Sequence, residues 1–307
     1  MNQYHQNKTQ KLGQLLNGRE AARILRARIA GFIRTHKEHM QAPGLAVLLV
    51  GEDPASKIYV RKKGVQAQEV GMNSMTLKFQ EDVSEKELLK EIRRLNQDPN
   101  IHGILIQLPL PPHINAQRLL NEVDYRKDVD GLGVINAGRL SLGMKEAIIP
   151  CTPLGCWRLL RTISPDLRGK KVLVIGASNL VGKPMAQLLI REQATVLIAN
   201  IHTENLSSLC REAEIIISAT GTSELVRGDW VQEGAIVIDV GINRVESEDG
   251  KVRLVGDVAF DEVKDKAAWI TPVPGGVGPM TVACLLENTL HAACVQQGWD
   301  ALLKYYL

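Results

Sequence analysis

Short apolar segments recur along the chain, and each ends at glycine, proline or a small polar residue. Most are apolar at every position rather than at alternate positions, which is typical of parallel strands buried on both faces. Amphipathic stretches at residues 85–96, 184–192 and 206–212 predict intervening helices, so the pattern indicates an α/β fold built from βαβ units. The predicted strands cover residues 45–50, 103–108, 171–175, 194–199, 214–219, 235–240 and 268–271.

Residues 124–153 interrupt this alternation. They carry turn residues and few periodic apolar positions, which predicts an inter-domain crossing. A second stretch rich in glycine and proline, residues 271–279, precedes an apolar helix over about residues 280–296. A chain that leaves a first domain near residue 150 and returns near residue 280 forms two α/β lobes, with a cleft between them for a small ligand.

Length and composition fit this organisation. A chain of 307 residues predicts two domains at about 150 residues each. Its 45% hydrophobic and 23% charged residues exclude a disordered chain and provide for a sizeable core. The net charge is only +3 and there is no basic run, so we expect no nucleic-acid partner. No apolar run approaches the ~20 residues of a membrane span, and no secretory signal is visible, so we expect a cytoplasmic protein. Residues 1–10 receive no role.

Cysteine usage supports neither a disulfide framework nor a metal site. The count is odd and no Cys-x-x-Cys pair exists, so we predict reduced thiols and no bound metal. The five cysteines are Cys151, Cys156, Cys210, Cys284 and Cys294.

A glycine turn after the strand at 171–175 gives the first chemical signal. Gly176, Ser178 and Gly182 lie between that strand and a predicted helix, where backbone N–H groups and the helix dipole can hold a phosphate. The spacing departs from Gly-x-Gly-x-x-Gly, and a turn without a ligand is the alternative. Three further buried strands favour a Rossmann-like dinucleotide-binding domain.

The end of the next strand leaves the choice of nicotinamide cofactor open. An acidic residue there accepts from the ribose 2′-OH of NAD, whereas a basic residue favours the 2′-phosphate of NADP. Residues 199–203 include neither. Asn200 and Thr203 can bond to either form, and His202 is only partly charged at neutral pH.

A second signal lies on a helix predicted to begin at Asp53 and Pro54, a favourable N-cap followed by a favourable first residue. In that helix Ser56, Tyr59 and Lys63 fall within roughly 60° of one another. One face therefore offers a hydroxyl, an aromatic ring and an amine. A solvated lysine beside a core-edge tyrosine is the alternative, because exposed lysines are the rule.

Two polar residues elsewhere favour the chemical interpretation. Gln107 interrupts an apolar strand near its carboxyl end, which is where ligands of open α/β sheets bind. Asp130 lies in a turn, where a plain Asx-type role is equally consistent with the sequence.

At this point the sequence resembles the bifunctional methylenetetrahydrofolate dehydrogenase/methenyltetrahydrofolate cyclohydrolase enzymes. The matching stretches run in family order across residues 12–292. They are ASKIY with Lys63, GILIQLPLP (103–111), KDVDG (127–131), NAGRL (136–140), PCTP (150–153), the glycine turn (176–184), AIVIDVGINR (235–244) and ITPVPGGVGPMT (270–281).

The resemblance implies a catalytic folate-binding domain over residues 11–150, completed by the C-terminal helix in 280–307, and a Rossmann-like NAD(P)-binding domain over residues 151–279. It also implies a small-molecule folate substrate, a homodimer and a role in one-carbon metabolism and purine biosynthesis. NADP is the family's default cofactor.

The resemblance also assigns residues. Lys63 matches the catalytic lysine, Gln107 the residue that positions and tunes it, Asp130 the carboxylate that holds the pterin, and Tyr59 the aromatic that packs on the folate rings. Further substrate contacts are implied at Ser56, Pro274, Gly275 and Gly278. Cofactor contacts are implied at Gly176, Ala177, Ser178, Val181, Ile242, Thr152 and Ile201.

The chemistry fits this assignment. Oxidation of the one-carbon bridge mainly requires two rings held in contact, whereas hydrolysis of the cationic product requires proton transfer. Burial and a cationic substrate both lower the pKa of a lysine, which suits Lys63 to that transfer, with Gln107 as its hydrogen-bond partner. In one respect the chain departs from the family. Asn200 and Ile201 stand where many members have histidine followed by serine or arginine, so we predict NAD use or relaxed specificity.

Three other functions are alternatives to this assignment. A dehydrogenase with little or no cyclohydrolase activity is the nearest alternative. A catalytically silent Rossmann-type binding protein is disfavoured by Tyr59, Lys63, Gln107 and Asp130. A hydroxyacid dehydrogenase lacks a recognisable His-Arg arrangement.

Overall fold

The computed structural model describes residues 12–246 and 252–299 and divides into two compact α/β units. Unit 1 contains Arg158–Gly278 and the N-terminal residues up to Gly18, and unit 2 contains Arg19–Trp157 and the residues from Pro279 onward. Residues 1–10, which receive no role from the sequence, lie outside the described residues. The interval 124–153 belongs to unit 2, and the chain passes from unit 2 to unit 1 within α6 (Cys151–Ile163) rather than in that interval.

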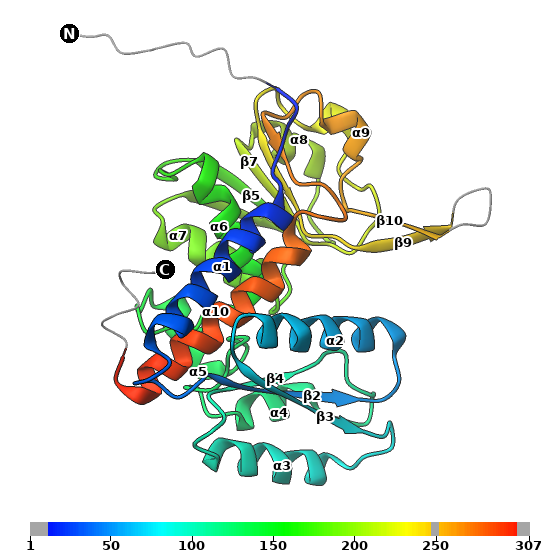
Figure 1. Cartoon of the computed structure of the whole chain (residues 1–307). Helices are drawn as coiled ribbons and strands as arrows, with labels where there is room; N and C mark the ends of the chain where they lie inside the picture. The colour runs from blue at the N-terminus through cyan, green and yellow to red at the C-terminus, as the bar shows by residue number, and fades with distance from the viewer. Residues whose placement is uncertain (1–11, 247–251, 300–307) are drawn as a thin grey trace. The chain divides into compact units, whose positions relative to one another are not determined.

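Unit 2 is built on a three-stranded parallel sheet with the order β3-β2-β4 (Figure 1). The strands are β2 (Gly44–Val50), β3 (Asn73–Phe79) and β4 (Gly103–Ile106). Every residue of β2 and β4 is buried, as their uninterrupted apolar sequences predict. β4 is shorter than predicted and ends immediately before Gln107. β3 was not predicted, because this edge strand mixes half-buried with exposed residues.

Helices cover both faces of this sheet, with α2 (Pro54–Glu69) on one side and α3 (Glu85–Gln97) on the other (Figure 1). The Asp53 carboxylate caps α2 by accepting from the Ser56 N–H at 2.7 Å, as predicted. Ser84 caps α3 in the same way, accepting from the Glu87 N–H. The other helices of unit 2 are α1 (Gly18–His36), α4 (Ala116–Glu122), α5 (Val134–Ser141), the first half of α6, and α10 (Val277–Gln297), of which the residues from Pro279 onward belong to unit 2.

Unit 1 contains a six-stranded, wholly parallel sheet with the order β1-β11-β8-β7-β5-β6. The chain goes from β5 to one side and returns to β7 on the other, so the strand order reverses between β5 and β7. Such a reversal leaves a crevice at the carboxyl ends of the strands. The strands are β1 (Gln14–Leu15), β5 (Lys171–Ile175), β6 (Thr195–Ala199), β7 (Ile215–Ser218), β8 (Ile236–Asp239) and β11 (Trp269–Ile270).

The remaining elements of unit 1 are a two-stranded ribbon and several helices. β9 (Asn243–Glu246) and β10 (Val252–Val255) pair antiparallel as a separate ribbon. The helices are α7 (Gly182–Arg191), α8 (Leu206–Glu212), α9 (Phe260–Val263) and the short 3-10 helix η1 (Gly228–Trp230). Within the described part of the chain, no helix combines the length and apolarity that crossing a membrane requires.

Candidate active site

Lys63 and Gln107 are brought together in unit 2. The Lys63 Nζ donates to the Gln107 Oε1 at 2.9 Å. Gln107 is itself fixed, because its Nε2 donates to the Leu108 carbonyl at 2.6 Å and its backbone N–H to the Leu48 carbonyl at 2.9 Å. The lysine on α2 and the glutamine after β4 are thus tied to each other, and the lysine is half-buried rather than extended into solvent.

Asp130 supplies the carboxylate of this group. Burial lowers the pKa of Lys63, and the charges of Asp130 and Cys151 act in the opposite direction. Burial has the opposite effect on Asp130, whose pKa it raises, while the charge of Lys63 and hydrogen bonding from Cys151 lower that pKa. An amine and a carboxyl that both resist ionisation lie within electrostatic range of each other, which suits proton transfer.

The loop that carries Asp130 is built by its own sequence. The Lys127 ammonium donates to the Leu95 and Asp98 carbonyls at the end of α3, at 3.1 and 2.8 Å. The Asp128 carboxylate accepts from the Gly133 N–H at 2.9 Å. Gly131 has φ +64°, and a Cβ there would lie 2.4 Å from the Ile148 carbonyl, so only glycine fits.

Buried amides hold this loop from two sides. The Asn136 Nδ2 donates to the Tyr125 carbonyl at 2.9 Å and to the Asp128 carboxylate at 3.0 Å. The Asn288 Nδ2, from α10, donates to the Val129 and Ile149 carbonyls, both at 2.9 Å. Part of the NAGRL and KDVDG stretches is therefore structural, and it fixes where Asp130 lies.

Cys151 is a member of the site that sequence reasoning missed. It is buried at the start of α6, and its Sγ donates to the Val129 carbonyl at 3.4 Å. Burial raises the pKa of its thiol well above the ordinary value, and Asp130 adds to that effect. The thiol therefore stays neutral beside the carboxyl. PCTP was the only signal, and it gave no indication of what the cysteine faces. All five cysteines are buried and free.

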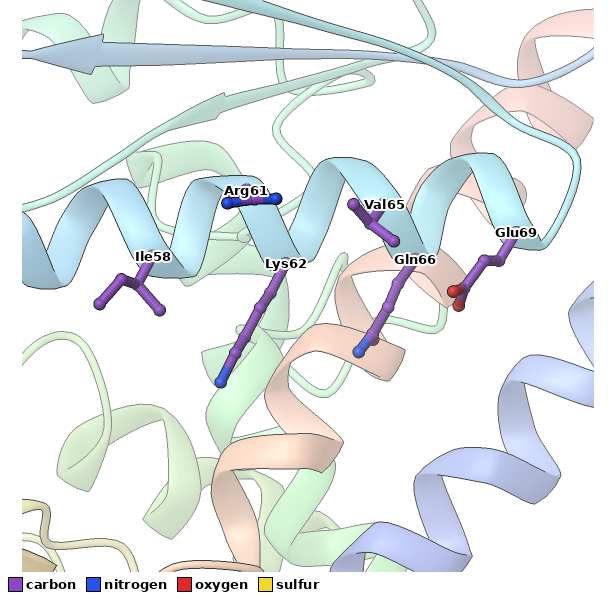
Figure 2. Close-up of a pocket in the computed structure, with 6 residues that line it drawn as sticks. All are labelled: Ile58, Arg61, Lys62, Val65, Gln66 and Glu69. Carbon is purple, nitrogen blue, oxygen red and sulfur yellow. The ribbon is translucent and has the colours of Figure 1, made fainter.

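Tyr59 and Ser56 share α2 with Lys63 but differ in exposure. Tyr59 is 37% exposed, whereas Ser56 is buried at 6%. Tyr59 is thus available to a flat ligand, while Ser56 packs inward. Next to this face, a cavity of about 370 Å³ opens along α2 (Figure 2). It is lined by Ile58, Arg61, Lys62, Val65, Gln66 and Glu69, none of which the sequence singled out.

The predicted glycine turn lies at the strand-order reversal of unit 1. Gly176 follows β5 with φ +110°, and a Cβ there would lie 2.2 Å from the carbonyl of Ala219, which follows β7. A Cβ on Gly182 would lie 1.8 Å from the Gly176 carbonyl. The turn therefore brings the start of α7 against the end of β5, which leaves the backbone of Ala177 and Ser178 able to approach a phosphate closely.

The last residue of β6 and the four residues after it, 199–203, include no lysine or arginine. The Asn200 Oδ1 accepts from the His202 N–H at 2.9 Å, and the Thr203 Oγ1 accepts from the Asn200 N–H at 2.8 Å. Both side-chain oxygens therefore serve the local turn. Ile201, one of the predicted cofactor contacts, is 94% exposed.

Two buried carboxylates, which sequence reasoning missed, hold the loops that follow β7 and β8. Asp239 accepts from the backbone N–H groups of Gly241, Asp257 and Val258 at 2.9–3.0 Å. Asp257 accepts from the Thr220 N–H at 2.6 Å and the Asn243 Nδ2 at 3.0 Å. The signal was an acid inside each apolar run, VIDVG and GDVAF.

The other predicted contacts divide between the units. Ile242 is 48% exposed in unit 1, which also contains Val181, Pro274, Gly275 and Gly278. Thr152 belongs to unit 2, where its Oγ1 lies 3.1 Å from the Thr281 Oγ1. Among the described residues, no group of three or more His, Cys, Asp or Glu is arranged to hold a metal.

Family models match both parts of the chain. The catalytic domain of tetrahydrofolate dehydrogenase/cyclohydrolase matches residues 16–130, and the NAD(P)-binding domain of the same enzymes matches residues 150–297. The chain belongs to the tetrahydrofolate dehydrogenase/cyclohydrolase family. Members of this family combine an oxidoreductase and a hydrolase activity on folate, and the chain carries both of the domains that these activities use.

Individual relatives agree. The chain is 56% identical to the bifunctional protein FolD of Gluconobacter oxydans over 284 residues, 92% of this chain and 93% of that protein. The crystal structure of the FolD enzyme of Campylobacter jejuni is 46% identical, with a TM-score of 0.87 over 91% of this chain and 98% of that one. The Trypanosoma brucei FolD structure, complexed with NADP and an inhibitor, is 37% identical with a TM-score of 0.85 over 90% and 96%.

The tight glycine contact yields a stability prediction. Gly182→Ala should lower the free energy of unfolding by about 1–3 kcal/mol or more, because the added methyl overlaps the Gly176 carbonyl. Gly31→Ala is the control: it lies in α1 with open space around it and should stabilise by up to about 1 kcal/mol. Thermal and urea denaturation measure both. Equal effects of the two variants would contradict the close contact.

The lowered pKa of Lys63 yields a pH prediction. The unfolded amine titrates near its ordinary value of 10.5 and the folded amine below it, so between these two pKa values the unfolded chain binds more protons. Folding stability should therefore rise with pH across that window in the wild type and not in Lys63→Met. The exposed neighbour, as Lys62→Met, is the control. Urea denaturation from pH 7 to 10 tests this, and parallel curves for wild type and Lys63→Met would contradict it.

Proposed function

We propose that the chain oxidises 5,10-methylenetetrahydrofolate with NAD(P)⁺ and then hydrolyses 5,10-methenyltetrahydrofolate to 10-formyltetrahydrofolate. In this proposal Lys63 carries the proton transfer of the second reaction, with Gln107 and Asp130 as the other catalytic residues beside it, and the glycine turn of unit 1 holds the cofactor. The observation that carries it is the Lys63–Gln107 hydrogen bond of 2.9 Å at a half-buried amine within range of Asp130.

Each group of the site has a distinct task in the hydrolysis. Tyr59 offers a partly exposed ring on which the folate ring system packs, and Asp130 holds the pterin. Burial lowers the pKa of Lys63, so more of its amine is neutral and free to take a proton from the attacking water. The amine returns that proton to the ring nitrogen as the ring opens, and the proton left on the added hydroxyl is released to water. Gln107, held by Leu48 and Leu108, keeps that amine aimed.

The cofactor fits the backbone cradle of unit 1. Gly176, Ala177, Ser178 and Val181, between β5 and the N-terminus of α7, would hold its phosphates, since glycines at 176 and 182 let this turn pack closely between the strand and the helix. When bound, the nicotinamide accepts a hydride from the substrate's one-carbon bridge. The remaining proposed cofactor contacts are Thr152, Ile201 and Ile242. The remaining proposed substrate contacts are Ser56, Pro274, Gly275 and Gly278.

We further propose a cytoplasmic homodimer acting in one-carbon metabolism, where the formyl product serves purine biosynthesis. The proposed compartment, oligomeric state and metabolic role all rest on the resemblance to the family.

Replacing the lysine tests the catalytic role. Lys63→Met should lower cyclohydrolase kcat by at least about 100-fold, the usual contribution of a positioned acid or base, while folate binding stays measurable. Hydrolysis of methenyltetrahydrofolate above the uncatalysed rate measures it, with Lys62→Met as the matched control. Full activity of Lys63→Met would refute the role, and a wild type without hydrolysis would leave the dehydrogenase-only alternative.

The exposed Ile201 yields a cofactor prediction. Because residues 199–203 include no lysine or arginine, we propose that the wild type uses NAD, or both cofactors within about tenfold in kcat/KM, a difference of ~1.4 kcal/mol. Ile201→Arg should raise the preference for NADP by about tenfold or more. Ile190→Arg, at an isoleucine of α7 that is 53% exposed, controls for added charge. A large NADP preference in the wild type would overturn this proposal.

A further inference from the structure

Asn288 joins the two segments that flank the catalytic carboxyl. It lies on α10, is 4% exposed, and donates through one Nδ2 to the carbonyls of Val129 and Ile149, both at 2.9 Å. Val129 immediately precedes Asp130, and Ile149 lies two residues before Cys151. The same Nδ2 lies 3.7 Å from the Cys151 Sγ. One amide group therefore touches both chain segments that place Asp130 and its neighbour.

Other contacts also join these two segments, among them hydrogen bonds from the Cys151 backbone and thiol to the Asp130 carboxyl. The Cys151 Sγ donates to the Val129 carbonyl at 3.4 Å, a weak hydrogen bond. Gly131 packs against the Ile148 carbonyl with no side chain between them. The buried Asn136 also reaches this region, but its bond to the Ile148 N–H is long, at 3.4 Å. The two bonds of Asn288, both of 2.9 Å, add a bridge between the Val129 and Ile149 backbones.

We propose that Asn288 is a positioning residue for the hydrolysis, which sets the distance between the Asp130 carboxyl and the Lys63 amine. The proposal goes beyond the proposed function and depends on it, because it assumes that Lys63 carries the proton transfer. Asn288 touches neither of these two residues. It acts through the Val129 and Ile149 carbonyls, and no motif in the sequence assigned it a role.

The consequence is electrostatic. The titratable groups that act on Lys63 are Asp130, from the loop, and the Cys151 thiol, from α6. Asp130 in turn is acted on by Lys63 and Cys151, and it also raises the pKa of the buried Asp128. If Asp130 moves away, Lys63 loses the charge that opposes the effect of its burial, so the lysine pKa falls further.

The test compares Asn288→Ala with the wild type in both reactions. Cyclohydrolase kcat should fall by about 10- to 100-fold, as for a reacting group displaced by about an ångström. Dehydrogenase kcat should change less than about threefold. The limb of the cyclohydrolase pH profile that disappears in Lys63→Met should shift to lower pH. Folate KM should rise alike in both reactions, because Asp130 serves binding in each.

Asn96→Ala is the matched control. Asn96 also bridges two backbone groups of unit 2, donating to the Glu122 carbonyl at 2.8 Å and accepting from the Asp124 N–H at 2.9 Å, without touching Val129 or Ile149. It should cost stability and leave the pH profile unchanged. If Asn288→Ala does not fold, Asn288→Ser, which keeps one donor, takes its place and should give a smaller shift in the same direction.

The outcomes separate the two proposals. Equal losses in both reactions with an unshifted pH profile, or no loss at all, would overturn the positioning role of Asn288 while the proposed function stands. A wild type without cyclohydrolase activity, or an active Lys63→Met, would instead overturn the proposed function itself.

Discussion

The proposed chemistry of this protein depends on keeping one lysine amine partly buried. A lysine in such a place loses hydration, so its ammonium form becomes costly and its pKa falls. The amine also requires an acceptor, which Gln107 provides. Gln107 occupies the first position after β4, where its backbone is bonded to β2 and its side chain reaches α2. The position of the Lys63 amine is thus set by two neighbouring strands of a buried sheet and not by a loop.

Asp130, by contrast, lies on a loop, and much of unit 2 serves to make that loop rigid. Lys127, a buried lysine, has its ammonium at the end of α3, where backbone carbonyls lack helical partners. The Asp128 carboxylate accepts hydrogen bonds from the Asn136 amide and from the Gly133 backbone N–H. Polar groups buried in this way rigidify a structure only when each has its partner. The neutral Cys151 thiol fits the same logic, because a thiolate beside Asp130 would repel it.

The sequence predicted what local pattern determines. Uninterrupted apolar runs identified β2, β5, β7 and β8, and capping chemistry identified the start of α2. It did not predict β3, whose residues alternate between half-buried and exposed at a sheet edge. Nor did it predict α1, although that helix is amphipathic. Cys151 and Asn288 escaped for another reason: their partners are distant along the chain, and no local pattern reports a contact across 22 or 159 residues.

The carboxylates of unit 1 pose an electrostatic problem that the structure resolves locally. Two buried acids lie near a turn suited to anionic phosphates, and a bare negative charge there would oppose binding. Burial raises the pKa of Asp239 to about 7, so at neutral pH it is partly protonated. The Asp257 side chain instead accepts hydrogen bonds from the Thr220 and Gly221 N–H groups and from the Asn243 amide. These bonds fix the loops, while the side chains of Asn200 and Ile201 at the end of β6 stay exposed. In the proposed function, the residues that hold the loops and the residue that sets the choice of cofactor are therefore different.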